Sequence, residues 1–223
     1  MKNIVDLRLK ILHLSTYDTR GGAAKAAYRL HNSLKTMDID SQMLVQLKSS
    51  NDEDVTATDS EIVQNFSKLR FHLDSSLPKL LFKSFDKSKW IPYSFHWLPD
   101  SIASRVSDIN PDVINLHWIS GGFLSIETIA KLNKPIVWTL HDMWAFTGGC
   151  HYSQECDNYK ESCGNCPQMP PKHYIDLSSW VWKRKSKAWA NLNGTIVTPS
   201  LWLAKCAASS FLLKDWRVEA AHL

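Results

Sequence analysis

Two histidines, each at the end of a short apolar run, are the first residues in this sequence that could take part in chemistry. His117 closes the run VINLH and precedes Trp118, and His141 follows the run IVWTL and precedes Asp142. One buried histidine is usually a hydrogen-bonded core residue, but two that close parallel strands would share the carboxyl edge of one sheet. There an imidazole can form hydrogen bonds to a reacting group, and the neighbouring carboxylate can orient it. We therefore predict an active site with His141 and Asp142, in which His117 and Trp118 bind a ligand.

A glycine pair follows the first apolar run of the chain. Gly21 and Gly22 stand between KILHLS (residues 10–15) and a segment whose apolar residues recur at helical spacing. Glycine lets the backbone approach a ligand closely, and a helix that starts here would present free N–H groups to an anion. The pair matches neither the G-x-G-x-x-G dinucleotide fingerprint nor a P-loop. It is either a tight connection or a loop that binds phosphate or acceptor, and its place after a strand favours binding.

Four cysteines lie close together in the sequence, and the last two form a C-x2-C pair: Cys150, Cys156, Cys163 and Cys166. This pair has the spacing that lets two thiolates reach one tetrahedral metal ion. Because the N-terminus does not resemble a secretion signal, a metal is favoured over disulfides. We predict a structural zinc with these four ligands, for which His151 is a substitute ligand. Free thiols, or disulfides formed after purification, are the alternative.

The elements that would position these residues alternate along the chain. Short apolar, β-branched runs predict strands, and apolar residues at helical spacing predict helices. Strands are expected over residues 10–15, 41–47, 113–117, 136–140 and 195–198, a loop over 51–60, and helices after 22, over 100–109, 124–132 and 176–192, and from 200. This alternation is typical of a parallel sheet covered on both faces. The predicted fold class is therefore α/β, a doubly wound, Rossmann-like parallel sheet with Gly21 and His141 at the same edge.

The composition is that of a globular protein with one core. Hydrophobic residues make up 44% of the chain and charged residues 22%, with a formal net charge of +4. This charge is too small to favour nucleic acid as a partner. Five cysteines without a secretion signal indicate a cytoplasmic protein. Residues 66–97 mix six lysines or arginines with Phe, Leu and Trp. That mixture fits either contact with the anionic inner face of a membrane or a solvated pair of amphipathic helices.

Several segments together resemble a known family. ILHLSTYDTRGGAAKAAYRLHNSL, PDVINLHW and KPIVWTLHDMWAFTGGCHY with CGNCPQ resemble the N-terminal domain of glycosyltransferase family 4, in the branch that builds bacterial capsule, colanic-acid-like or O-antigen polysaccharides. The likeness covers about residues 10 to 219, and HDMWAFTGGC with its cysteine loop is its most specific part. It implies the GT-B fold, in which two Rossmann-like domains face a cleft. It also implies that Gly21 and Gly22 lie beside the donor phosphates and acceptor. His141 would lie close to the transferred sugar, in a retaining transfer without a metal at the chemistry.

The resemblance also sets the expected domains and partners. Residues 1–219 would form the acceptor-side domain with a Cys-rich loop at 148–171, and residues 220–223 would be a truncation point or cloning scar. The donor-binding domain would be absent, so the chain alone should not transfer sugar efficiently. The expected partners are a saccharide or lipid-linked saccharide acceptor and a nucleotide-sugar held mainly by the missing domain. The rival function is a stand-alone, metal-stabilised module that binds a carbohydrate or lipid-linked sugar. A nicotinamide oxidoreductase is a weaker rival, because no dinucleotide fingerprint follows any predicted strand.

Overall fold

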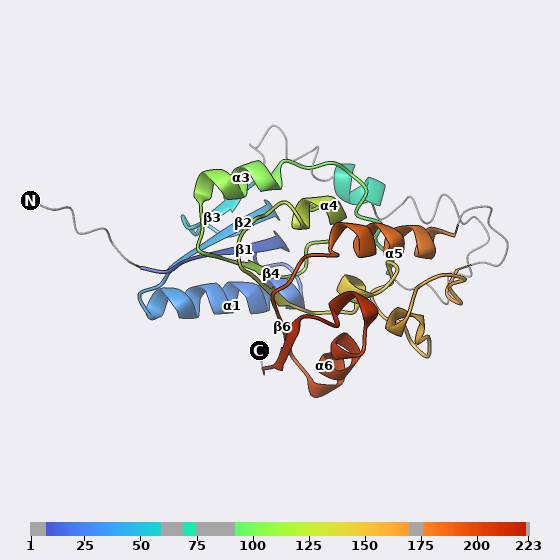
Figure 1. Cartoon of the computed structure of the whole chain (residues 1–223). Helices are drawn as coiled ribbons and strands as arrows, with labels where there is room; N and C mark the ends of the chain where they lie inside the picture. The colour runs from blue at the N-terminus through green and yellow to red at the C-terminus, as the bar shows by residue number, and fades with distance from the viewer. Residues whose placement is uncertain (1–7, 59–68, 75–91, 170–175, 222–223) are drawn as a thin grey trace, which may run out of the picture.

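A parallel β-sheet forms the centre of the protein (Figure 1). The computed structural model describes residues 8–58, 69–74, 92–169 and 176–221. Within these residues the sheet has the strand order β3-β2-β1-β4-β5-β6-β7, and all neighbouring strands are parallel. The strands are β1 (Lys10–Tyr17), β2 (Asp40–Leu47), β3 (Val55–Ala57), β4 (Val113–Leu116), β5 (Ile136–Thr139), β6 (Thr195–Thr198) and β7 (Arg217–Ala220).

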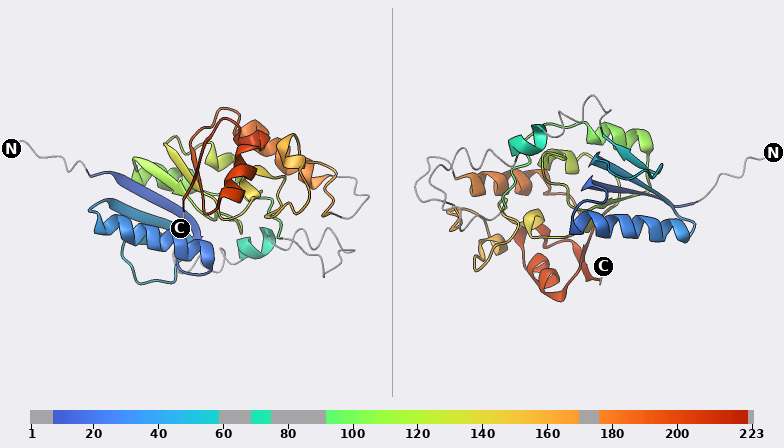
Figure 2. Two further views of the ribbon diagram at one scale, coloured as in Figure 1. Left: turned by 90° about the horizontal axis from the view of Figure 1, so that it is seen from below. Right: turned by 180° about the vertical axis from the view of Figure 1, so that it is seen from behind.

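Helices cover both faces of this sheet. α1 lies on one face and α3 on the other, and the view from behind in Figure 2 shows β1, β2 and β3 between them. α5 packs against α4 on the same side as α3 (Figure 1). The helices are α1 (Gly22–Thr36), α3 (Ile102–Ile109), α4 (Ile126–Ile129), α5 (Leu177–Ala188) and α6 (Leu201–Ala208), with 3-10 turns η2 (Trp144–Phe146), η3 (Asn158–Lys160) and η4 (Phe211–Leu213).

Side chains fix where three of the helices begin. Ser125, Asp176 and Ser200 cap α4, α5 and α6, and each accepts a hydrogen bond from the backbone N–H three residues later. Such a cap stabilises a helix by about 1 kcal/mol because it pairs an N–H that has no partner within the helix. α1 has no side-chain cap, since glycine occupies its N-cap position.

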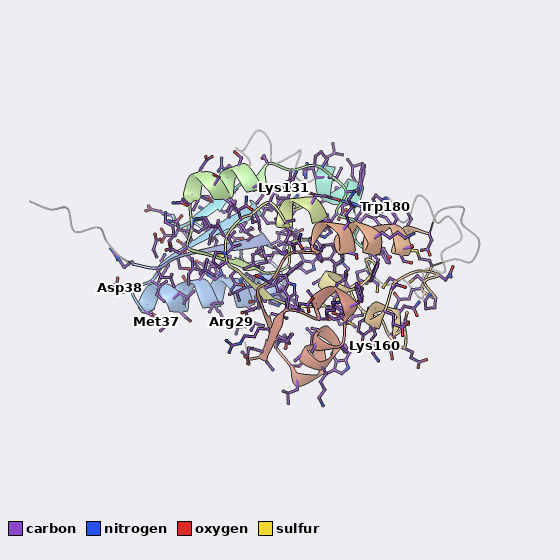
Figure 3. The ribbon with its side chains drawn as sticks, in the orientation of Figure 1. Arg29, Met37, Asp38, Lys131, Lys160 and Trp180 are labelled. Atoms are coloured by element: carbon purple, nitrogen blue, oxygen red, sulfur yellow. The ribbon has the colours of Figure 1, made fainter. Side chains whose placement is uncertain are left out.

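The central strands are buried on both faces. Leu12 and Leu14 of β1 and Leu116 of β4 expose none of their surface, which explains why these strands read as nearly continuous apolar runs. Trp138 of β5 centres an aromatic part of the core, with ring centroids 5.5 to 6.3 Å from those of three other tryptophans, Trp144, Trp189 and Trp216. By contrast, Arg29 of α1, Lys131 after α4 and Lys160 of η3 lie exposed on the outer surface (Figure 3).

The structure confirms the predicted α/β fold with its parallel sheet, and it corrects some boundaries. Residues 55–57 lie in the predicted loop but form β3, which pairs with β2. β7 was not predicted; it includes Ala220, and the N–H of Ala221 donates to the carbonyl of Thr198 at 2.9 Å. The sheet therefore continues beyond residue 219. The helix expected over residues 124–132 is a single turn, Ile126–Ile129.

The segment proposed for membrane contact is only partly described. Residues 66–68 and 75–91 lie outside the described residues, and residues 69–74 are helical. Leu69 and Leu73 expose about half of their surface, 50% and 44%. Among the described residues there is no helix with the length and apolar character needed to cross a bilayer.

Candidate functional site

A cleft of about 460 Å³ opens at the carboxyl edge of the sheet. Its walls come from the β1–α1 loop, from Trp118 after β4, from His141 and Asp142 after β5, and from His151 and Tyr152 in the following loop. Figure 1 shows the end of β1 beside the start of α1. Gly21 and His141 thus line one cleft, as the sequence predicts. A volume of this size is typical of small-molecule sites, which in open α/β sheets lie at this edge.

The β1–α1 loop contributes backbone, not side chains, to the cleft. Gly21 has φ +89° and ψ 169°, a conformation that essentially only glycine adopts. A Cβ atom at Gly21 or Gly22 would meet no atom within 4 Å, so the space in front of both residues is open. The free N–H groups of the first turn of α1 and the Arg20 side chain make this end of the cleft electropositive. No acidic residue in that turn offsets their charge.

Asp18 holds the β1–α1 loop in place through hydrogen bonds to the backbone. Its buried carboxylate accepts hydrogen bonds from the backbone N–H groups of Thr19, Ser49 and Ser50, at 2.8, 2.9 and 2.7 Å. Burial acts to raise the pKa of Asp18, but these hydrogen bonds outweigh it and lower the pKa below the usual value. The ionised carboxylate thus joins the loop after β1 to the loop after β2.

His141 and His117 lie together, but only His141 is on the cleft wall. Nε2 of His141 is 3.3 Å from Nδ1 of His117, and the rings stack with centroids 5.6 Å apart. His117 is buried, does not line the cleft, and uses its other ring nitrogen to contact His13 at 3.0 Å. Burial lowers the pKa of both imidazoles. The structure therefore gives His117, predicted as a ligand-binding residue, a position behind His141.

Asp142 orients groups other than the histidine beside it in the sequence. Its carboxylate accepts hydrogen bonds from Nε1 of Trp118 (3.0 Å), Nδ1 of His151 (2.6 Å) and the backbone N–H of Trp144 (2.9 Å). Burial acts to raise the pKa of Asp142, while His151 and the N–H of Trp144 lower it below its usual value. Trp118 lies nearly parallel to the ring of Tyr17, with centroids 6.3 Å apart and a 10° angle. Asp142 therefore fixes an indole and an imidazole on the cleft wall.

His151 is a cleft residue that sequence reasoning assigned only as a spare metal ligand. Its Nδ1 faces Asp142, and its Nε2 forms a hydrogen bond with Oγ of Ser94 at 3.0 Å. The order Ser–His–Asp is that of hydrolase triads, but Ser94 is buried and does not line the cleft. We interpret Ser94 as an anchor for the His151 ring. The position of His151 nine residues after Asp142 gave no signal, because only the folded loop brings the two together.

A buried lysine on α5, Lys185, holds the loop between Asp142 and His151. Nζ of Lys185 donates to the backbone carbonyls of Trp144 and Thr147, the latter at 3.0 Å, and lies 3.6 Å from the centroid of the Trp144 ring. Burial lowers the pKa of Lys185 well below its usual value. Lys185 thus links α5 to the segment that follows Asp142.

The predicted metal centre is not found. The four cysteines of the loop line one small cavity of about 20 Å³, and all are free thiols. However, no group of three or more His, Cys, Asp or Glu side chains in the described part of the chain is arranged to hold a metal ion. The thiols have local partners instead: Sγ of Cys163 accepts from the N–H of Gly148 at 3.0 Å. Burial raises the pKa of Cys150 to about 12 and that of Cys163 to about 11.

The fold and the cleft define a Rossmann-like domain with a polar site at the carboxyl edge of its sheet. No family model matches the sequence, and no solved structure matches it. A curated relative, "Putative colanic acid biosynthesis glycosyl transferase WcaC" of Escherichia coli (strain K12), is 24% identical over 173 residues. The match covers 72% of this chain and 40% of the relative. The chain thus spans well under half the length of this relative. The relative is named as a glycosyltransferase, the class that the motifs predict, while the family 4 assignment stays a prediction.

Proposed function

We propose that this chain is the acceptor-side domain of a retaining, GT-B glycosyltransferase that moves a sugar from a nucleotide-sugar to a saccharide or lipid-linked saccharide. The observation that carries the proposal is the cleft itself, which combines the open N-terminus of α1 and Arg20 with His141 and the Trp118 ring. The similarity to a named glycosyltransferase supports the same class of reaction.

Each wall of the cleft suits one part of this reaction. The free N–H groups of α1 and the Arg20 guanidinium would stabilise the diphosphate of the donor, whose negative charge grows as it departs. The parallel rings of Tyr17 and Trp118 offer flat apolar faces to a sugar ring. His141 would form a hydrogen bond with the transferred sugar. The nucleotide would be bound mainly by a second domain.

The proposed transfer breaks one bond and forms another at the anomeric carbon. The bond from that carbon to the diphosphate oxygen breaks, the acceptor hydroxyl bonds to the same face of the sugar, and the hydroxyl proton leaves with the diphosphate. Because charge develops on the leaving group and on the sugar ring, preorganised hydrogen-bond donors and acceptors account for most of the expected acceleration.

A transfer assay tests the proposal. The protein encoded by the complete reading frame would be incubated with a panel of nucleotide-sugars and lipid-linked acceptors, and the products analysed by mass spectrometry. We expect one donor to yield a glycosylated acceptor with the anomeric configuration of the donor. Saccharide binding without transfer from any donor would instead support the rival function, a carbohydrate-binding module.

A further inference from the structure

A row of polar side chains runs from the cleft across the face of the sheet that α1 covers, to the loop after β2. It starts at His141 after β5, passes through His117 and His13, reaches Ser41 of β2, and continues to His31 of α1 and Asp52. Nε2 of His141 lies 3.3 Å from Nδ1 of His117, and Nε2 of His117 lies 3.0 Å from Nδ1 of His13. Oγ of Ser41 lies 3.2 Å from Nε2 of His13 and 2.8 Å from Nδ1 of His31. At the end of the row, Nε2 of His31 lies 3.5 Å from Oδ2 of Asp52.

The inner members of this row are buried and neutral. His13 and His31 expose none of their surface, and His117 exposes 3%. Burial lowers the pKa of all three imidazoles, that of His13 to about 3. A neutral imidazole carries one N–H donor and one acceptor nitrogen. The hydrogen bond between His31 and Ser41 can point either way: the Ser41 hydroxyl donates if His31 carries its hydrogen on Nε2, and accepts if His31 carries it on Nδ1.

Asp52 decides between the two directions. Its carboxylate is ionised: burial acts to raise its pKa, but the N–H of Asp54 and the ammonium of Lys35 outweigh burial and lower it. A carboxylate only accepts hydrogen bonds. Nε2 of His31 lies 3.5 Å from Oδ2 of Asp52, beyond ordinary hydrogen-bond distance, and this buried nitrogen has no hydrogen-bond partner among the described residues. The opposite direction would aim a lone pair of His31 at a negative charge. The hydrogen of His31 therefore lies on Nε2.

The position of the hydrogen on His31 then fixes the donor and acceptor of every other hydrogen bond in the row. The Ser41 hydroxyl donates to His31, His13 donates from Nε2 to Ser41, and His117 donates from Nε2 to His13. His141 must then donate from Nε2 to Nδ1 of His117. This leaves Nδ1 of His141 without a hydrogen, and within the described residues no protein group is hydrogen-bonded to it.

We propose that Ser41 and Asp52 are positioning residues that hold His141 as the Nε2–H tautomer, so that its Nδ1 accepts a hydrogen bond from a hydroxyl of the sugar or acceptor. The cleft would then have two chemically distinct ends. The N-terminus of α1 with Arg20 takes an anion, and His141 takes a neutral hydroxyl donor and disfavours a phosphate oxygen. The tautomer follows from the row alone, whereas its use in sugar transfer rests on the proposed function.

Nitrogen NMR of the histidine rings tests the tautomer without any substrate. In 15N-labelled protein at pH 7.5, long-range proton–nitrogen spectra distinguish a ring nitrogen that carries hydrogen from one that does not, and His141→Gln identifies the His141 signals. We expect Nε2 of His141 to carry the hydrogen. We expect Ser41→Ala, which breaks the row, and Asp52→Asn, which removes its charge, to shift His141 toward a mixture of tautomers.

Asp54→Asn is the matched control, because Asp54 shares the Lys35 ion pair with Asp52 but has no hydrogen bond to His31. It should leave the His141 signals unchanged. The proposal is overturned if wild-type His141 carries its hydrogen on Nδ1, a result that needs no variant to fold. An unchanged His141 spectrum in both Ser41→Ala and Asp52→Asn would also overturn it.

A transfer assay on the same variants separates this proposal from the proposed function. Asp52→Asn should lower kcat about twofold if the two tautomers become equally populated, because only the molecules with the Nε2–H tautomer remain competent. The KM for the nucleotide-sugar should change little, and Asp54→Asn should change neither constant. The expected tautomer without transfer from any donor would refute the proposed function alone. Transfer by wild type with equal kcat in Asp52→Asn and wild type would refute the positioning role alone.

Discussion

At the scale of single residues, His141 is the side chain on which the proposed chemistry depends most. It lines the cleft, and its ring is held by stacking on His117. We predict that His141→Ala in the complete enzyme lowers turnover about a hundredfold, because one preorganised hydrogen bond to the reacting sugar is lost. The melting temperature should change little. Turnover close to that of wild type, together with a melting temperature several degrees lower, would show that His141 is only a core residue.

Asp18 gives a prediction about stability and pH. Because the pKa of Asp18 is lower in the folded state, its contribution is fully present above the unfolded pKa of about 4 and is lost as the pH falls through the folded value. Asp18→Asn should lower the free energy of unfolding by about 2 kcal/mol at pH 7, and by less near pH 3.

Urea denaturation at both pH values measures this difference. Asp38→Asn is the control, because the Asp38 side chain is 86% exposed in its ion pair with Arg8 and such surface pairs contribute little. A loss for Asp18→Asn that is equal at pH 7 and pH 3 would mean that its charge is not what holds the loop.

At the scale of elements, the start of α1 separates backbone strain from access to the cleft. Gly22 is the first helical residue and faces open space, whereas Gly21 has a positive φ. We predict that Gly22→Val leaves the melting temperature nearly unchanged but weakens ligand binding at least tenfold, because the side chain fills the cleft beside the helix N-terminus. Gly21→Ala should instead destabilise the fold by about 1 to 3 kcal/mol.

Calorimetry of ligand binding and of thermal unfolding would be compared for the two variants. If Gly22→Val bound nucleotide-sugar and acceptor as wild type does, the first turn of α1 would not be part of the ligand site.

α5 provides the second prediction at this scale. Lys185 donates to two buried carbonyls of the segment after Asp142. Lys185→Met keeps most of the packing but leaves those carbonyls without a donor, so we expect a loss of about 2 kcal/mol in the free energy of unfolding. Lys187→Met on the same helix is exposed and should be close to neutral.

The fluorescence of the tryptophans in this part of the core reports on the same change, because Trp144 and Trp189 both lie against the lysine. Equal unfolding free energies for Lys185→Met and wild type would contradict a role of Lys185 in holding the loop.

At the scale of the whole molecule, the sequence predicts the strands and motifs that depend on residues adjacent in the chain. It does not predict the contacts between residues that are distant in the chain. The central strands were predictable because burial on both faces leaves a run such as IVWT (Ile136–Thr139) with little polar character. β3 and β7 were missed because they are short edge strands and few of their residues are buried. The spacing of the cysteines was visible, but the directions of their thiols depend on the folded loop.

The same limit applies to the candidate site. Gly21 and His141 were predicted because each lies in the loop that follows a strand. His13 and His31 were not, because one lies inside a strand and the other on a helix, and neither belongs to a local motif. His13 meets His117 across 104 residues of sequence. Only the strand order, which places β1 beside β4, makes that pairing necessary.

That strand order also has a consequence for how the chain folds. β1 is completed on one side by β2, which follows soon in the sequence, but its other neighbour is β4, and Lys10 bonds to Asp112 across 102 residues. During synthesis at roughly 5 to 20 residues per second, β1 therefore leaves one edge unpaired for several seconds after it has emerged from the ribosome. Contacts so distant in sequence are typical of slow folding. The histidine row would form late, because it needs β1, β4 and the end of β5 together.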